Sequence, residues 1–252
     1  MPPYRFDAHC HIFDPHFALQ ASCAPLPAAF TCDDYRARVA PLGFTGGAVV
    51  ATPAQGWRQG HLLDALRRLG PGYVGVARLP LNVGNSELDT LNSFGVRGLR
   101  LTLKRGASVA PEQCLALARR VHQHTGWHAE VTLDPRELAD FEESLAQLPA
   151  LCLDLRVLAR GCLPSLLRLV ERGARIKLFG IGRLNASCTA LLDDLYSANP
   201  QALMFGSGLP SADSTTAAVQ RDLDTLSEVL GEAALPRLLW HNAAQLYRVQ
   251  PF

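Results

Sequence analysis

Two histidines stand near the beginning of the chain, separated by one residue, in Asp7-Ala8-His9-Cys10-His11. Because successive side chains of a strand point to opposite faces, Asp7, His9 and His11 are expected to share one face and Cys10 the other. Two imidazoles on one face can bind a divalent metal such as zinc, or polarise a substrate oxygen directly. The same spacing also occurs where two histidines are hydrogen-bonded within a core, so the surrounding elements must decide between these interpretations.

A carboxylate with comparable placement occurs in the segment 128–132, which reads His-Ala-Glu-Val-Thr. Strand alternation puts Glu130 on one face together with His128 and Thr132. If that face points into the same mouth as the two histidines, Glu130 could act as a metal ligand or as a general base.

Basic side chains gather around residues 97–105 and 177–183; they are Arg97, Arg100, Lys104, Arg105, Lys177 and Arg183. A guanidinium group matches a carboxylate with two parallel hydrogen bonds, so this set could hold an anionic molecule. Lys104 and Arg105 could equally be solvated surface residues. Lys177 alternates with Ile176 and Leu178, which places it inside the predicted mouth rather than among the helices.

Short apolar runs that indicate strands recur along the chain, at residues 4–9, 46–51, 73–79, 96–102, 127–133, 151–155, 175–179 and 202–205. Helical periodicity follows most of them, at residues 60–69, 111–122, 135–148, 163–172, 187–198 and 215–230. Strands that alternate with helices pair in parallel, so eight such units predict one (β/α)8 TIM barrel over residues 1–252. An open doubly wound sheet is the alternative, but the turn after the first run lacks the glycines it requires.

Charge and composition exclude several classes of protein. The 252 residues include 24 Lys and Arg and 23 Asp and Glu, for a net charge of +1, and 48% are hydrophobic. This balance offers no electrostatic footprint for nucleic acid, and no run approaches the ~20 apolar residues of a membrane span. The first residues contain no apolar export signal, which predicts a cytoplasmic location. The seven cysteines are scattered, which indicates reduced thiols rather than a disulfide framework.

Five segments together resemble the amidohydrolase superfamily, in the branch of 2-pyrone-4,6-dicarboxylate lactonase. They are residues 6–15, 95–101, 176–180 with Arg183 soon after, 205–210 and 240–247. The resemblance implies a distorted (β/α)8 barrel, which agrees with the strand count. It also implies a site at the carboxyl ends of the strands, where His9 and His11 bind metal or polarise a carbonyl and where Arg100, Lys177 and Arg183 hold substrate carboxylates.

Two positions depart from that family pattern. A histidine is expected after Asp154, where the chain has Leu155, and an aspartate that accepts a proton from water is expected at Gly208. A catalytic zinc normally has three protein ligands, and His9 and His11 supply two. Glu130 is the proposed substitute, and Asp213 is a less direct one because it would have to reach back from a loop. A shift of the alignment by one residue is a further alternative.

The sequence therefore predicts a hydrolase of a small carboxylate-bearing lactone or cyclic amide, with His9, His11 and Glu130 as catalytic residues. The alternative is a descendant of the same family that binds a small anionic molecule without turnover. A zinc ion on His9 and His11 and a metal-independent site are both compatible with these residues. Neither nucleic acid nor membrane is expected as a partner, and the sequence sets no oligomeric state.

Overall fold

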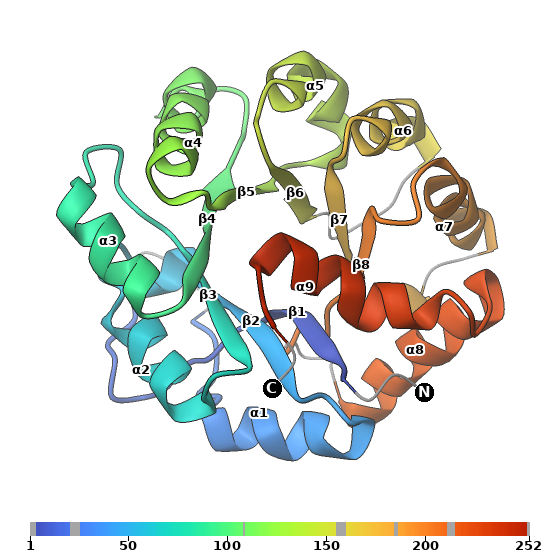
Figure 1. The fold of residues 1–252 in the computed structure, drawn as a ribbon, viewed down its shortest axis with the longest axis horizontal. Coiled ribbons are helices and arrows are strands. Elements are labelled where there is room, and N and C mark those ends of the chain that lie inside the picture. Colours follow the sequence, from blue (N-terminus) through green and yellow to red (C-terminus); the bar gives the residue numbers. More distant parts are fainter. Residues whose placement is uncertain are drawn as a thin grey trace.

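Eight parallel strands form the centre of the molecule (Figure 1). The computed structural model describes residues 4–20, 26–107, 109–154, 160–183, 186–210 and 215–250. The strands are β1 (Phe6–Cys10), β2 (Gly46–Val50), β3 (Tyr73–Ala77), β4 (Val96–Thr102), β5 (His128–Thr132), β6 (Leu151–Asp154), β7 (Arg175–Leu178) and β8 (Leu203–Phe205). Seven of the strands fall within their predicted runs, and β1 extends one residue beyond its run, to Cys10; the order of the strands in the sheet is their order in the chain. The predicted TIM barrel is thereby confirmed.

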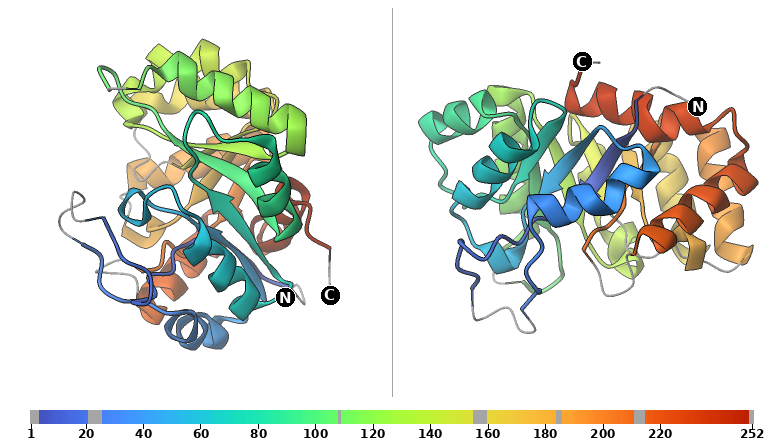
Figure 2. Two further views of the ribbon diagram at one scale, coloured as in Figure 1. Left: turned by 90° about the vertical axis from the view of Figure 1, so that its left-hand side faces the viewer. Right: turned by 90° about the horizontal axis from the view of Figure 1, so that it is seen from below.

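Helices surround this sheet on its outer side, except the last one, which lies across one end of the barrel (Figures 1 and 2). They are α1 (Cys32–Val39), α2 (Gly60–Leu69), α3 (Asn85–Ser93), α4 (Pro111–Thr125), α5 (Leu138–Ala146), α6 (Leu163–Glu171), α7 (Ala186–Ala198), α8 (Thr216–Leu230) and α9 (Asn242–Tyr247). The six predicted helical segments correspond to α2 and to α4–α8. No helix in the described ranges is both long and apolar enough to cross a membrane.

Helical periodicity did not indicate α1, α3 or the short α9, and the first two carry little apolar periodicity. Helix α1 begins at Thr31, whose side chain forms a capping box with Asp34. In α3 only Leu88 and Leu91 are buried, so tertiary packing rather than a broad apolar stripe holds this helix on the barrel.

The barrel closes where β1 meets the segment that follows β8. The amide of Gly208 donates to the carbonyl of His9 at 2.9 Å, and the amide of His11 donates to the carbonyl of Leu209 at 2.7 Å. Gly206 permits this approach, because a Cβ atom on it would lie 2.7 Å from the Cβ of His9. The seam therefore holds His9 and His11 at the carboxyl end of the sheet.

Apolar side chains close the opposite, amino end of the barrel. Phe6, Ala8 and their neighbours on β2, β3, β6 and β8 form an inner core that packs on Trp240 and on Tyr247 of α9. Helix α9 lies across this end (Figure 1). The Tyr247 hydroxyl donates to the Ala8 carbonyl at 3.2 Å. The barrel thus has a covered floor, and polar side chains can meet solvent only at the other end.

Substitution of Gly206 by Ala tests the closure of the barrel. The added methyl group would meet the Cβ of His9 at 2.7 Å and its backbone nitrogen at 3.1 Å. We expect Gly206→Ala to lower the free energy of unfolding by about 1–3 kcal/mol, as overpacking does in other cores. Urea unfolding measures the change. The control Gly84→Ala, which meets nothing within 4 Å, should lose less than about 1 kcal/mol; equal losses would contradict the close approach.

Candidate active site

His9 of β1 and His11, which directly follows that strand, lie next to each other at the carboxyl end of the barrel. Their Nε2 atoms are 3.2 Å apart, and the Nδ1 atom of His11 is 2.7 Å from the Val50 carbonyl oxygen. Because a carbonyl only accepts, His11 carries its proton on Nδ1 and its Nε2 accepts from the Nε2–H of His9. This assignment leaves Nδ1 of His9 unprotonated. Within the described residues that buried atom has no hydrogen-bond partner.

The predicted alternation along β1 is wrong for Asp7. The register between β1 and β2 shifts between Asp7 and Cys10, and such a bulge breaks the two-residue period. Asp7 accepts hydrogen bonds from the hydroxyls of Tyr35 and Ser207 at 3.0 and 2.6 Å, so it is tied to α1 and to the barrel seam. It acts as a structural anchor, and His9 and His11 alone face the site. Cys10 points away, with its thiol near the Ala48 carbonyl.

Both histidines are held in the neutral form. Burial lowers the pKa of His9 well below its usual value, and the positive charges of Lys177 and Arg100 lower it further. Burial and Arg100 lower the pKa of His11 to about 4. At neutral pH the pair therefore offers a lone pair rather than a charge.

Four charged side chains, one from each of β4 to β7, form a connected network next to the histidines. Arg100 donates to Glu130 at 2.9 Å and to Asp154 at 2.5 Å, and Lys177 donates to Glu130 at 2.5 Å. Each of the four is at most 8% exposed. Two positive and two negative charges cancel within the cluster, which is the condition under which a protein interior tolerates ions.

Glu130 points into the barrel, as the sequence predicted, but it is tightly held. Burial alone would raise its pKa, whereas Lys177, His128 and Arg100 lower it, and the net pKa lies well below the usual value. Both carboxylate oxygens accept from cations. A carboxylate stabilised to this degree in its ionised form is a weak proton acceptor, which argues against the predicted role as general base.

Lys177 also lies inside the barrel, as predicted, but below the histidines rather than at the mouth. Its side chain is fully buried, and its ammonium group lies 5.6 Å from the centre of the Tyr247 ring. With Nζ bound to Glu130, it positions that carboxylate and is not presented to a substrate. Arg100, which is 8% exposed, lies near both histidines, and its charge lowers the pKa of each.

Several other predicted positions fall elsewhere. The backbone of Arg183 ends the short turn Ile181–Arg183 after β7, but its side chain, like Leu155 and Asp213, lies outside the described residues. Arg97 bonds to Asn92 at the amino end of β4, away from the site. Lys104 and Arg105 are exposed in the loop after β4.

Gly208 fills the position where the family resemblance expects an acidic residue. Its φ is +66°, and a Cβ atom there would lie 3.3 Å from the ring of Phe179. That ring stacks on His9, with ring centres 5.0 Å apart at an interplanar angle of 23°. An aromatic contact thus accompanies the missing carboxylate, and sequence analysis did not identify Phe179 as part of the site.

Asp154 is the residue whose role sequence analysis missed most clearly. It was noted only as the neighbour of an absent histidine, yet its Oδ2 lies 3.9 Å from His9 and accepts from both Arg100 and Thr132. Strand alternation could have placed Asp154 inside the barrel, because it follows the inward-facing Cys152 by two residues.

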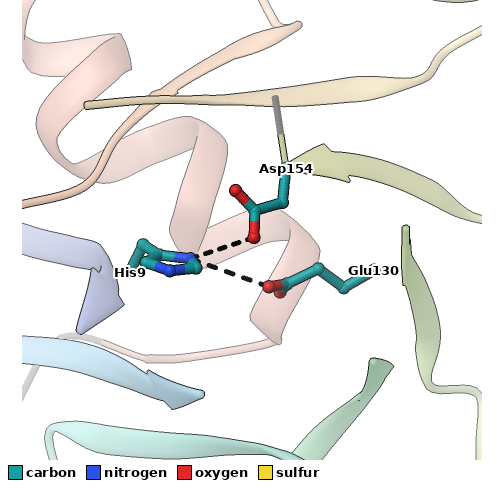
Figure 3. A group of neighbouring side chains, drawn as sticks. All are labelled: His9, Glu130 and Asp154. Atoms are coloured by element: carbon teal, nitrogen blue, oxygen red, sulfur yellow. Dashed lines mark ion pairs between the residues drawn. The ribbon is translucent and has the colours of Figure 1, made fainter. Parts of the chain in front are cut away.

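The described residues contain one group that could hold a metal ion, formed by His9, Glu130 and Asp154 (Figure 3). Their ligand atoms all lie within 4.8 Å of one another. His11 is outside this group, so the predicted pair of His9 and His11 supplies only two ligands. Arg100 already binds both carboxylates of the group, and a divalent ion would meet its positive charge. With Arg100 in place, the residues do not fit a catalytic metal.

Sequence comparisons give this site a context. A family model described as amidohydrolase matches residues 6–249. A 2-pyrone-4,6-dicarboxylate hydrolase from Comamonas testosteroni is 28% identical over 155 residues, which are 59% of this chain and 50% of that protein. The match therefore spans about half the length of this curated relative.

Structural comparisons show the same fold at lower identity. An apo structure of a protein from Agrobacterium tumefaciens has a TM-score of 0.86 at 19% identity, covering 100% of this chain and 96% of that one. A candidate 2-pyrone-4,6-dicarboxylic acid hydrolase from Acinetobacter baumannii, solved with citric acid bound, has a TM-score of 0.80 at 18% identity, covering 97% and 99%. All of these chains share the nearly closed eight-stranded barrel.

Removal of the Lys177 charge tests the buried network. Lys177→Met leaves Glu130 ionised in the interior with one cation fewer, and loss of one partner of a buried pair costs about 3–5 kcal/mol of unfolding free energy. Adding Glu130→Gln removes the unpaired charge, so we expect the double variant to lose less than the sum of the two single variants. Urea unfolding measures all three. The exposed control Lys104→Met should change stability by less than about 0.5 kcal/mol.

The low pKa of His11 predicts a pH dependence of stability. The unfolded chain binds a proton on this residue near pH 6.5, whereas the folded chain does so only near pH 4. The unfolded state therefore holds more protons between these values, and stability falls as the pH is lowered through this window. We expect His11→Gln to reduce the slope of unfolding free energy against pH between 6.5 and 4. Identical slopes for the two proteins would contradict the neutral state of His11 in the folded protein.

Proposed function

Because the chain belongs to the amidohydrolase family, we propose that it hydrolyses a small carboxylate-bearing lactone or cyclic amide at the carboxyl end of the barrel. The observation that carries this proposal is the neutral pair of His9 and His11 beside the guanidinium of Arg100. The histidine pair offers a nitrogen lone pair that can accept a proton, and Arg100 places a fixed positive charge beside it. The first can activate the attacking water and the second can stabilise the oxyanion during hydrolysis of a carbonyl compound.

The comparisons support the substrate class without defining it. The curated relative from Comamonas testosteroni is named for a cyclic dicarboxylate, and the Acinetobacter baumannii structure holds citric acid, a small polyanion. Arg100 is the charged residue of this chain that we propose to attract such a carboxylate or the developing oxyanion. Its planar fork suits an anion better than a lysine ammonium group would.

The proposed mechanism uses residues of the chain alone. His11 is partly exposed at the mouth, and we propose that its Nε2 takes a proton from the attacking water once substrate displaces its bond to His9. The water oxygen bonds to the carbonyl carbon while Arg100 stabilises the oxyanion. When the ring bond breaks, the imidazolium returns its proton to the leaving oxygen or nitrogen. Glu130 and Lys177 hold Arg100 and the local charge balance in place.

A second candidate function is binding without turnover. The observation that favours it is the state of the acids: Gly208 carries no carboxylate, and Glu130 and Asp154 both bind cations. Under this alternative the mouth would bind a small anionic molecule and release it unchanged. The two functions differ only in whether the bound molecule is hydrolysed, so both can be measured on one set of compounds.

A panel of lactones and cyclic amides with one or two carboxylates tests the proposal. We expect hydrolysis of at least one compound, and His11→Ala should lower kcat by about 100-fold or more, as loss of a general base does. Product formation is followed by chromatography. His241→Ala, an exposed histidine near the covered end of the barrel, is the matched control and should retain full activity.

Calorimetry on the same panel separates the two functions. Binding of a compound without any product would favour the binding protein and overturn the hydrolase. If no compound in the panel binds or reacts, the substrate class itself is wrong.

A further inference from the structure

The carboxylate oxygens that approach His9 are the same oxygens that bind Arg100. Oε1 of Glu130 lies 3.7 Å from Nδ1 of His9, and Oδ2 of Asp154 lies 3.9 Å from it. The guanidinium takes Oε1 at 2.9 Å and Oδ2 at 2.5 Å. One nitrogen and two oxygens thus converge on a region that Arg100 borders, and His9 Nδ1 has no hydrogen-bond partner within the described chain.

This set of ligands has the composition of a site for a divalent metal. One imidazole and two carboxylates are ligands that zinc commonly uses, and all three side chains are buried. The imidazole is unprotonated at Nδ1 in the arrangement shown, which is the form that binds a metal. The three side chains are therefore of the types that bind zinc, and the positive charge of Arg100 is what opposes metal binding.

The charge count explains why arginine and metal exclude each other. Arg100 and Lys177 balance Glu130 and Asp154, so the four charges of the cluster sum to zero. A divalent ion added to this set would leave two uncompensated positive charges in the interior, which is strongly unfavourable. Without Arg100 the set carries one net negative charge, and a divalent ion would then be attracted to it.

We infer that the guanidinium of Arg100 is the resident cation of this centre, and that it occupies the ligand group that would otherwise bind a divalent metal. Arginine suits this role because its fork bridges two carboxylates at once and keeps its charge at every accessible pH. The native protein accordingly works without a metal at His9, Glu130 and Asp154. This inference does not rest on the proposed hydrolysis, because it concerns only what the three side chains bind.

Zinc binding by an arginine variant tests the inference. We expect Arg100→Ala to bind one Zn²⁺ per chain, measured by calorimetry and by elemental analysis after dialysis, and the native protein to bind none at this group. Co²⁺ gives a second readout, because its visible absorption reports the coordination number. In the variant background, His9→Ala should weaken zinc binding by at least about 100-fold.

Four further variants keep the result interpretable. Arg100→Lys retains the positive charge and should bind no zinc, and Arg97→Ala removes a guanidinium from the same strand away from the group and should also bind none. Glu130→Gln in the Arg100→Ala background should weaken zinc binding, whereas His11→Ala there should not, because His11 is outside the ligand group. This pair of results distinguishes the group from a site built on His9 and His11.

Folding of the variants is followed by circular dichroism, with and without zinc. If Arg100→Ala is unfolded alone but folds when Zn²⁺ is added, and His9→Ala abolishes that effect, the inference is supported. Zinc binding by the native protein that Glu130→Gln weakens would overturn it. So would an Arg100→Ala protein that is folded and binds no zinc, or one that is unfolded and that zinc does not rescue.

Discussion

The two hydrogen bonds by which Arg100 joins Glu130 to Asp154 are the interaction on which the site depends. Arg100 lies opposite Glu130 in the register of β4 and β5, and Asp154 lies opposite Lys177 in the register of β6 and β7. A slip of one residue in any of these pairs would turn a charged side chain outward, into the apolar layer under the helices. The network therefore constrains the sheet as strongly as the sheet positions the network.

Sequence alone was sufficient for the strands and for the faces of two charged residues. Short apolar runs indicated the eight strands, and the alternation of side chains along a strand indicated the inward positions of Glu130 and Lys177. The sequence-based prediction failed at Asp7, because a register shift in β1 breaks the two-residue period and no residue in that segment indicates the shift. It also could not assign partners, because the pairing of Arg100 with Asp154 joins strands that are not adjacent in the sheet.

The pairing changes the meaning of the residues that the family pattern lacks. Judged one position at a time, Gly208 looks like a damaged site. Considered together, Glu130 and Asp154 are paired with Arg100 and Lys177, and the two histidines are neutral. The ring of Phe179 stacks on His9 next to Gly208. These are mutually consistent changes, and they describe a centre organised around an arginine. Under the proposed mechanism its chemistry rests on neutral imidazoles and a fixed guanidinium rather than on a carboxylate base.

The covered floor of the barrel has a consequence for the order in which the molecule is built. Tyr247 lies beneath Lys177, against the rings of Phe6 and His128, and it belongs to the last helix of the described chain. During synthesis β4 to β7 leave the ribosome long before this helix does. Until it docks, water can reach the four charges from below, so their full desolvation is delayed until the barrel around them is complete. The strands can thus find their register while the ions are still hydrated, and the last helix then seals the arrangement.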